Sequence, residues 1–208
     1  MERLKPTDQA SPSPSAEDSD RESDEALWQR FVAHEDTEAF GQLFLRYERT
    51  VLNLTWRLLG HREEAEDIKQ EAFLRVLTKA EQFRGDCSFK TWILRIAHNL
   101  CYSALRRRRR RPETEPLEAL IVEPQEEHVD ANPEAHLLRR ELTVQVQNAL
   151  QSLPEHHRTL IVLRELEGLS YEEIAETLGC SRNAVKVRLY RAREALRKKM
   201  QHFWSEPP

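Results

Sequence analysis

The chain has 208 residues, of which 33% are charged and 39% hydrophobic, and it carries a formal net charge of −4. This length allows one or two domains, and no stretch approaches the ~20 apolar residues of a membrane-spanning helix, so we expect no membrane insertion. The negative total does not exclude nucleic acid as a partner, because the charges are segregated: acidic residues gather at 17–25 and 113–134, and basic residues at 106–111 and 182–199.

Two polar stretches divide the chain. Residues 1–23 are rich in Ser, Pro, Asp and Glu and have too little apolar surface to order themselves, which predicts a disordered acidic tail. Residues 112–133 are rich in Pro and Glu and lack Lys and Arg, which is typical of an extended linker. Because long alternating β-branched runs are absent, the predicted fold class is all-α, with small helical domains at 24–111 and 134–204 joined by a flexible acidic linker.

Four helices are expected in the first domain, over 24–34, 37–59, 62–79 and from 89 into the arginine tract. Gly60 suits the end of the second helix, because Gly takes the left-handed conformation at little cost. Ser88 can cap the fourth helix. The third helix is amphipathic: its apolar stripe is Ala65, Ile68, Ala72, Phe73, Val76 and Leu77, and its other side carries Glu64, Asp67, Glu71 and Arg75.

The fourth helix buries one face and presents a mixed polar face. Its apolar stripe is Phe89, Ile93, Ile96 and Leu100, and its opposite side carries Thr91, Arg95, His98 and Tyr102. Cations, hydrogen-bonding groups and an aromatic ring together can hold a nucleic-acid backbone and stack bases. The six consecutive arginines at 106–111 repel one another unless a polyanion is near. The same tract could be a nuclear-localisation signal, but nothing else in the sequence points to a nucleus.

Residues 169–193 have the pattern of a helix-turn-helix. Ile174, Ala175 and Leu178 form an apolar stripe, Gly179 ends the first helix, and Ser181 can cap the second. The buried stripe of the second helix is Val185, Leu189, Ala192 and Leu196. Its exposed arc is Asn183, Lys186, Val187, Tyr190 and Arg191, flanked by Arg182, Arg188 and Arg193. A recognition helix needs one packed face and one face that reaches bases and phosphates.

The cysteines do not indicate a metal site. Cys87, Cys101 and Cys180 are widely spaced and belong to no zinc-binding pattern. The adjacent pair His156 and His157 points in different directions on a helix and seldom shares a ligand. We expect reduced thiols, no metal, no cofactor and a cytoplasmic protein.

Three segments resemble bacterial sigma factors. Residues 65–75 (AEDIKQEAFLR) are similar to the region 2.2 motif, 83–100 (FRGDCSFKTWILRIAHNL) to the segment that melts the promoter and reads the −10 element, and 153–166 with the helix-turn-helix to region 4. A linker too short for a region 3 domain resembles the layout of the extracytoplasmic-function (ECF) subgroup.

The resemblance implies a factor that binds core RNA polymerase through the β′ clamp helices and the β flap, recognises −10 and −35 promoter DNA and promotes strand opening. It implies no catalytic residue and no enzymatic activity, and an anti-sigma factor as a further partner. The implied polymerase-binding residues are Asp67, Gln70 and Glu71. The implied −10 residues are Phe83, Arg95, His98, Asn99, Tyr102 and Arg106. The implied −35 residues are Arg164, Arg182, Asn183, Lys186, Arg188, Tyr190, Arg191 and Arg193.

Several of these residues have more specific expectations. Phe83 is a candidate wall for a flipped base, whereas Trp92 is expected in the core. Arg164 is a candidate phosphate clamp, and Lys186 and Arg191 are candidates for contacts to bases or nearby phosphates. The acidic linker would follow the RNA exit path of the polymerase, or serve only as a tether.

Three other classes of function compete with this interpretation. A helix-turn-helix regulator that binds duplex DNA without polymerase explains 169–199 but not the first domain. A hydrolase or metal-dependent enzyme has no supporting constellation. An RNA-binding or antitermination factor would also use an arginine tract.

Overall fold

The structure is a computed structural model that describes residues 22–110 and 133–205. Within these ranges every regular element is helical, which confirms the all-α fold class. The expected tail and linker lie almost entirely outside the described residues. The elements in chain order are α1 (Asp24–His34), α2 (Thr37–Leu59), α3 (Arg62–Thr78), the 3-10 turn η2 (Ala80–Gln82), α4 (Phe89–Arg110), α5 (Pro133–Gln151), α6 (Glu155–Ile161), the π-helical segment η3 (Val162–Leu166), α7 (Tyr171–Leu178) and α8 (Arg182–Ser205).

Local signals set the helix ends where the sequence predicted them. Gly60 follows α2 with φ +81°, and Gly179 follows α7 with φ +61°, both in the left-handed region that favours Gly. The Ser88 hydroxyl accepts the N–H of Thr91 at 3.1 Å and so caps α4. Ser181 caps α8 in the same way, through the N–H of Ala184 at 3.2 Å. Each cap satisfies backbone groups that have no partner within their own helix.

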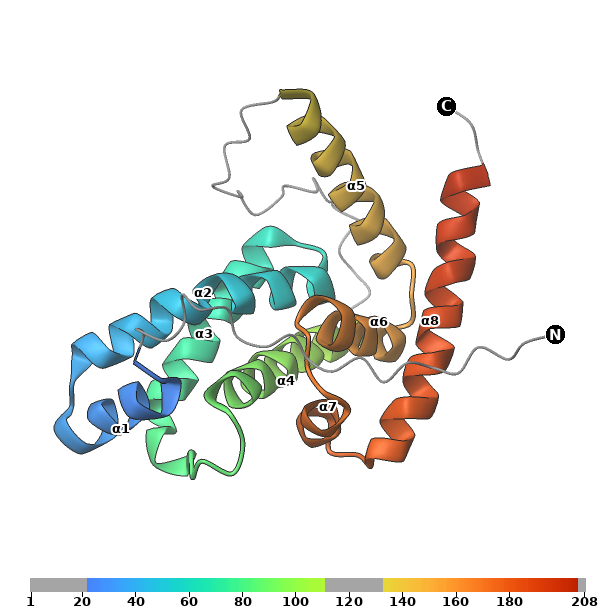
Figure 1. Cartoon of the computed structure of the whole chain (residues 1–208). Helices are drawn as coiled ribbons and strands as arrows, with labels where there is room; N and C mark the ends of the chain where they lie inside the picture. Colours follow the sequence, from blue (N-terminus) through green and yellow to red (C-terminus); the bar gives the residue numbers. More distant parts are fainter. Residues whose placement is uncertain (1–21, 111–132, 206–208) are drawn as a thin grey trace, which may run out of the picture.

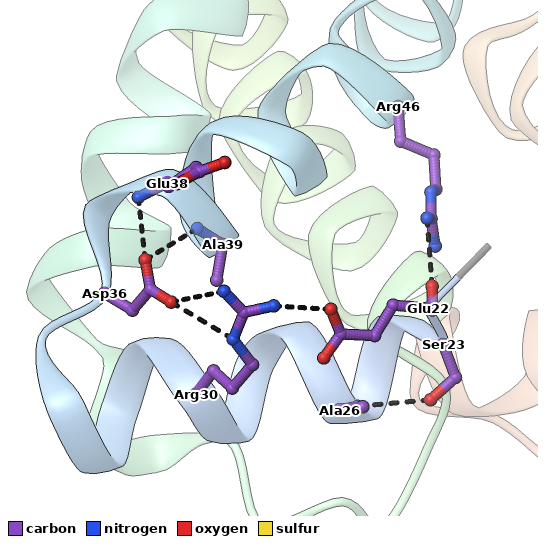
Figure 2. Close-up of polar contacts among 8 residues, drawn as sticks. All are labelled: Glu22, Ser23, Ala26, Arg30, Asp36, Glu38, Ala39 and Arg46. Carbon is purple, nitrogen blue, oxygen red and sulfur yellow. Dashed lines mark hydrogen bonds and ion pairs between the residues drawn. The ribbon is translucent and has the colours of Figure 1, made fainter.

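A polar cluster fixes the angle between α1 and α2 (Figure 2). The Asp36 carboxylate caps α2 by accepting the N–H groups of Glu38 and Ala39, and it also receives the Arg30 guanidinium at 2.6 Å. Arg30 reaches back to the Glu22 carboxylate at 2.5 Å. Asp36 therefore caps one helix and tethers the preceding one, and its pKa is lowered, first by the N–H of Ala39 and then by Arg30.

We refer to α1–α4 as the N-terminal half and to α5–α8 as the C-terminal half. The N-terminal half packs around buried Leu, Val and Ile side chains and an aromatic cluster of Trp28, Phe31, Phe83, Phe89 and Trp92. Trp92 is 5% exposed, which confirms its place in the core. Each such ring removes much apolar area from water and stabilises the fold by roughly 1.5–3 kcal/mol.

The C-terminal half is smaller and centres on α8. Val185, Leu189 and Ala192 are buried against α6 and α7, as their spacing predicts. α7 begins with a capping box, in which Ser170 and Glu173 satisfy each other's backbone N–H groups. The η3 segment carries the chain from α6 to the loop before α7.

The two halves form one continuous hydrophobic cluster. α7 packs against α4, and α5, α6 and η3 pack against α2. Figure 1 shows α1 at one end of the molecule and α8 at the other, with α4 between them. The sequence left the arrangement of the two domains open; in this structure they are in contact.

Candidate nucleic-acid interface

The expected recognition face of α8 is open to solvent. All seven candidate residues on this helix are exposed: Arg182, Asn183, Lys186, Arg188, Tyr190, Arg191 and Arg193. Tyr190 is 68% exposed and the neighbouring Val187 is 54% exposed. The helix can present them because the opposite stripe is packed, so burial on one side orients the cationic side outward. This geometry suits insertion of a helix into a DNA major groove.

Two ion pairs border the α8 face. Arg182 Nε lies 2.7 Å from Glu172 Oε1, and Arg193 Nη2 lies 2.7 Å from Glu165 Oε1. All four side chains are substantially exposed, so each pair contributes only about 0–1 kcal/mol. A phosphate group could replace either carboxylate at little cost.

Arg164 is the −35 candidate outside α8: it lies on η3, next to Glu165, which pairs with Arg193 of α8. Its Nη1 donates to the Leu169 carbonyl at 2.7 Å, and its guanidinium lies 5.0 Å from the ring centre of Tyr171. These contacts hold the loop that enters α7. Its expected role as a phosphate clamp stays a prediction.

The expected face of α4 is partly covered by the C-terminal half. Thr91 is fully buried, and its hydroxyl donates to the Glu173 carboxylate of α7 at 2.9 Å. Arg95 Nη1 lies 3.5 Å from Glu176 Oε1 of α7. The expectation that Thr91 lines an open nucleic-acid face is therefore wrong, because α7 packs on the first two turns of α4.

Further along α4 the candidate residues are more accessible. Asn99, Tyr102 and Arg106 are exposed, and the His98 and Tyr102 rings stack with centroids 6.4 Å apart. Burial lowers the pKa of the His98 imidazole, so this side chain is neutral at pH 7. A neutral imidazole can accept a hydrogen bond from a base edge but provides no charge for a phosphate.

A cavity of about 510 Å³ lies between this part of α4 and the C-terminal half, and residues of both line it. It brings together candidates expected to contact different promoter elements: His98, Asn99 and Tyr102 of α4 and Arg188 of α8. This proximity could not be predicted from the sequence, because Arg188 lies 86 or more positions after each of the three α4 residues.

Phe83 lies in the aromatic cluster of the N-terminal half. Its ring centroid is 4.8 Å from that of Trp92 and 5.6 Å from that of Trp28. The side chain is half-buried, whereas Arg84, Gly85 and Asp86, which follow it, are exposed. Phe83 thus anchors the loop to the core, and its proposed role as a base-stacking wall stays a prediction.

The outer face of α3 is acidic and apolar. Asp67 and Gln70 are exposed, and Glu71 pairs with Arg75 Nε at 2.8 Å. Leu74 is 56% exposed on the same face, one turn from Gln70 and Glu71, and it lies outside the apolar stripe predicted for this helix. Leu77, expected in the buried stripe, is 39% exposed because the helix ends one residue later. A mixed acidic and apolar face is suited to a protein partner.

The arginine tract continues α4 into solvent. Arg106 to Arg110 are exposed, and Arg109 Nη2 pairs with Glu155 Oε2 at 2.8 Å. Arg111 lies outside the described residues.

Neither a membrane-spanning helix nor a metal-binding cluster is found in the described part of the chain. Each of its helices is too short or too polar to cross a bilayer. The same residues bring no three His, Cys, Asp or Glu side chains together.

Comparison with known proteins gives a consistent result in both halves. The family model for sigma-70 region 2 matches residues 43–111, and the model for sigma-70 region 4 matches 143–196. The RNA polymerase sigma-H factor of Pseudomonas aeruginosa is 40% identical over 190 residues, which cover 89% of this chain and 98% of the relative. The ECF RNA polymerase sigma-E factor of Escherichia coli is 38% identical over 187 residues, covering 88% and 97%.

Solved structures share the fold. The sigma factor RpoE of Bartonella quintana, in complex with the anti-sigma factor NepR, matches with a TM-score of 0.63 and 24% identity, over 78% of this chain and 96% of that one. CnrH, in complex with the cytosolic domain of CnrY, also matches with a TM-score of 0.63 and 24% identity, over 87% and 99%.

Proposed function

This chain belongs to the ECF family of RNA polymerase sigma factors, and from that premise we propose which of its surfaces contact polymerase and promoter DNA. A sigma factor binds core RNA polymerase, recognises promoter elements and promotes strand opening. In this proposal α3 contacts the polymerase, α4 contacts the −10 element and α8 contacts the −35 element.

The open face of α8 is the observation that carries the assignment to −35 DNA. Lys186 and Arg191 lie at its centre and, among the described residues, form no ion pair that DNA would have to break. Arg182 and Arg193 at its border exchange exposed carboxylates for phosphates. Each phosphate contact releases counterions, so the binding weakens as salt rises.

The assignment of α4 to the −10 element rests on its exposed groups. Tyr102 can stack on an unpaired base, Asn99 can hydrogen-bond to a base edge, and Arg106 can bind phosphate. The contacts to unpaired bases exist only with separated strands, so they shift the duplex towards the open form.

The assignment of α3 to the polymerase rests on its exposed carboxylates and Leu74. Protein interfaces typically surround an apolar centre with polar groups, and the β′ clamp helices are the proposed partner of this face. The β flap is the proposed second contact, made by the C-terminal half. Because related structures hold anti-sigma factors, we also propose such a partner for this chain.

The chain itself is proposed to be non-catalytic and to act in the cytoplasm, where polymerase supplies the chemistry. The decisive experiment is run-off transcription with bacterial core polymerase on a genomic promoter pool, with and without the chain. We expect specific new transcripts with the wild-type chain and their loss with the double variant Asp67→Asn, Glu71→Gln.

A matched control removes two exposed carboxylates elsewhere: Glu38→Gln on α2 and Glu141→Gln on α5. It should retain transcription. If the wild-type chain gives no transcripts but binds duplex DNA tightly alone, the protein is a polymerase-independent regulator and the proposal is wrong.

A further inference from the structure

An apolar side chain, Val187, lies at the centre of the open face of α8 and is 54% exposed. We propose that Val187 recognises a thymine of the −35 element by packing against its C5 methyl group in the major groove. The inference rests on the proposed binding of α8 to −35 DNA. It adds the identity of one base, which the cations of this face do not specify.

Helix geometry directs Val187 away from the packed side of α8. Successive residues of an α-helix lie about 100° apart around its axis. Val187 is two positions from Val185 and two from Leu189, which are 0% and 1% exposed, so it lies nearly opposite both. Asn183 and Arg191, four positions before and after it, lie about 40° to either side. The residue that projects farthest from the packed side is therefore apolar.

The neighbouring cations suit the walls of a DNA groove. Lys186 and Arg188 are exposed and project about 100° to either side of Val187. Phosphates border the major groove and position a protein on the duplex, whereas base edges form its floor and carry the sequence. When the two cations reach the phosphates, Val187 points at the base edges.

The surroundings of Val187 favour DNA over a protein partner. Among the described side chains of α8, Tyr190 is the other exposed large hydrophobic residue. Lys186, Arg188 and Arg191 are exposed close to both. The centre of a protein interface is typically apolar and depleted of charge. A single valine among cations does not provide such a centre, but it is sufficient for contact with one methyl group.

The chemistry of valine selects thymine among the four bases. Thymine is the base whose major-groove edge carries a methyl group, whereas the other bases present only hydrogen-bonding groups there. A valine side chain has no donor or acceptor, so it would remove water from those polar groups without replacing the lost hydrogen bonds. Valine is also stiff at χ1 in a helix. Val187 therefore loses little rotamer freedom when DNA binds.

The test uses holoenzyme assembled from bacterial core polymerase and the full-length chain. Duplexes with a random segment are selected for binding and sequenced, once with the wild-type chain and once with Val187→Ser. Val187 is exposed, so the substitution should change stability little. We expect one position of the selected −35 element to prefer thymine with the wild-type chain and to lose that preference with Val187→Ser. Val32→Ser, at a 47% exposed valine of α1, is the matched control and should leave every preference unchanged.

A second measurement removes the methyl group alone. Uracil replaces the preferred thymine and keeps its hydrogen-bonding groups. We expect the wild-type holoenzyme to bind this duplex roughly fourfold more weakly, as expected for the loss of one buried carbon group. Val187→Ser should bind the two duplexes equally. Uracil at a thymine outside both promoter elements controls for changes in the duplex itself.

The outcomes separate this inference from the proposed function. If a −35 element is selected but uracil weakens binding equally for the wild-type chain and Val187→Ser, or for neither, Val187 recognises no methyl group and the inference is wrong, while α8 remains assigned to −35 DNA. If Val187→Ser weakens binding to all sequences alike, Val187 contacts protein and the inference is also wrong. If no −35 element is selected, the proposed function fails and the inference fails with it.

Discussion

The two cationic helices α4 and α8 differ in what covers them. The face of α8 is bordered by exposed ion pairs and open along its centre, whereas the first turns of α4 lie under α7 with a buried Thr91 hydroxyl. Both helices carry residues suited to nucleic acid. Their residue types therefore indicate what each helix can bind, and packing decides which of those side chains are exposed.

The largest expected effect is a loss of duplex DNA binding by the open face of α8. Lys186→Ala with Arg191→Ala should weaken binding to duplex promoter DNA roughly 100-fold, because each lost base or phosphate contact costs about 1–3 kcal/mol. Lys198→Ala with Lys199→Ala removes the same charge at exposed positions farther along α8 and serves as the control. Fluorescence anisotropy at a fixed salt concentration measures both; equal losses would mean that only total charge matters.

The stability of the chain should depend on pH through Glu167, which lies beside the covered start of α4. Burial raises the pKa of this carboxyl to about 7, with Lys90 and Arg57 partly opposing the rise. Ionisation therefore costs stability progressively as pH increases from the ordinary Glu pKa of 4.5 to about 7. Glu167→Gln cannot ionise, so it should stabilise the chain at pH 8, by at most about 3 kcal/mol, and change little at pH 4. Thermal unfolding at both pH values tests this, and an equal shift at both would contradict it.

The same reversal of charge should have different effects at the α4 face and at the α8 face. Glu176→Arg replaces the attraction to Arg95 with repulsion, which by the usual range for exposed pairs should favour opening by about fivefold. Glu172→Arg makes the same change beside Arg182 of α8 and should leave the halves together. The readout is the population of the open form in scattering profiles, and opening by both variants would show that charge alone, rather than position, controls it.

The smallest effect is expected at the border of α8. Glu172→Gln releases Arg182 from an exposed ion pair worth about 0–1 kcal/mol. Duplex DNA binding should improve less than threefold in anisotropy titrations. A tenfold gain would mean that α8 is also substantially blocked, and the comparison between the helices would fail.

Local chemistry made the helices predictable. Gly60, Gly179, Ser88 and Ser181 act through the backbone groups nearest to them, so residue type and position were enough to locate four helix ends. The exposed arc of α8 followed in the same way from the spacing of its apolar residues.

The covered face could not be predicted because its contacts are distant in sequence. Thr91 and Glu173 are 82 residues apart, and nothing in either segment signals the other. The exposure of Leu77, which was expected in the buried stripe of α3, likewise depends on where the helix ends and on which neighbours pack against it. The residues assigned to polymerase and DNA remain predictions.

The last turn of α2 is capped by side chains from the other half, so it depends on tertiary contacts for its integrity. Any separation of the halves would remove these external caps, and this turn should then fray. The amide of Gly60, which donates to the Trp56 carbonyl at 2.8 Å, would then exchange its hydrogen faster. The amide exchange rate at this helix end, which lies at the contact between the halves, would therefore report domain separation without any dye or promoter.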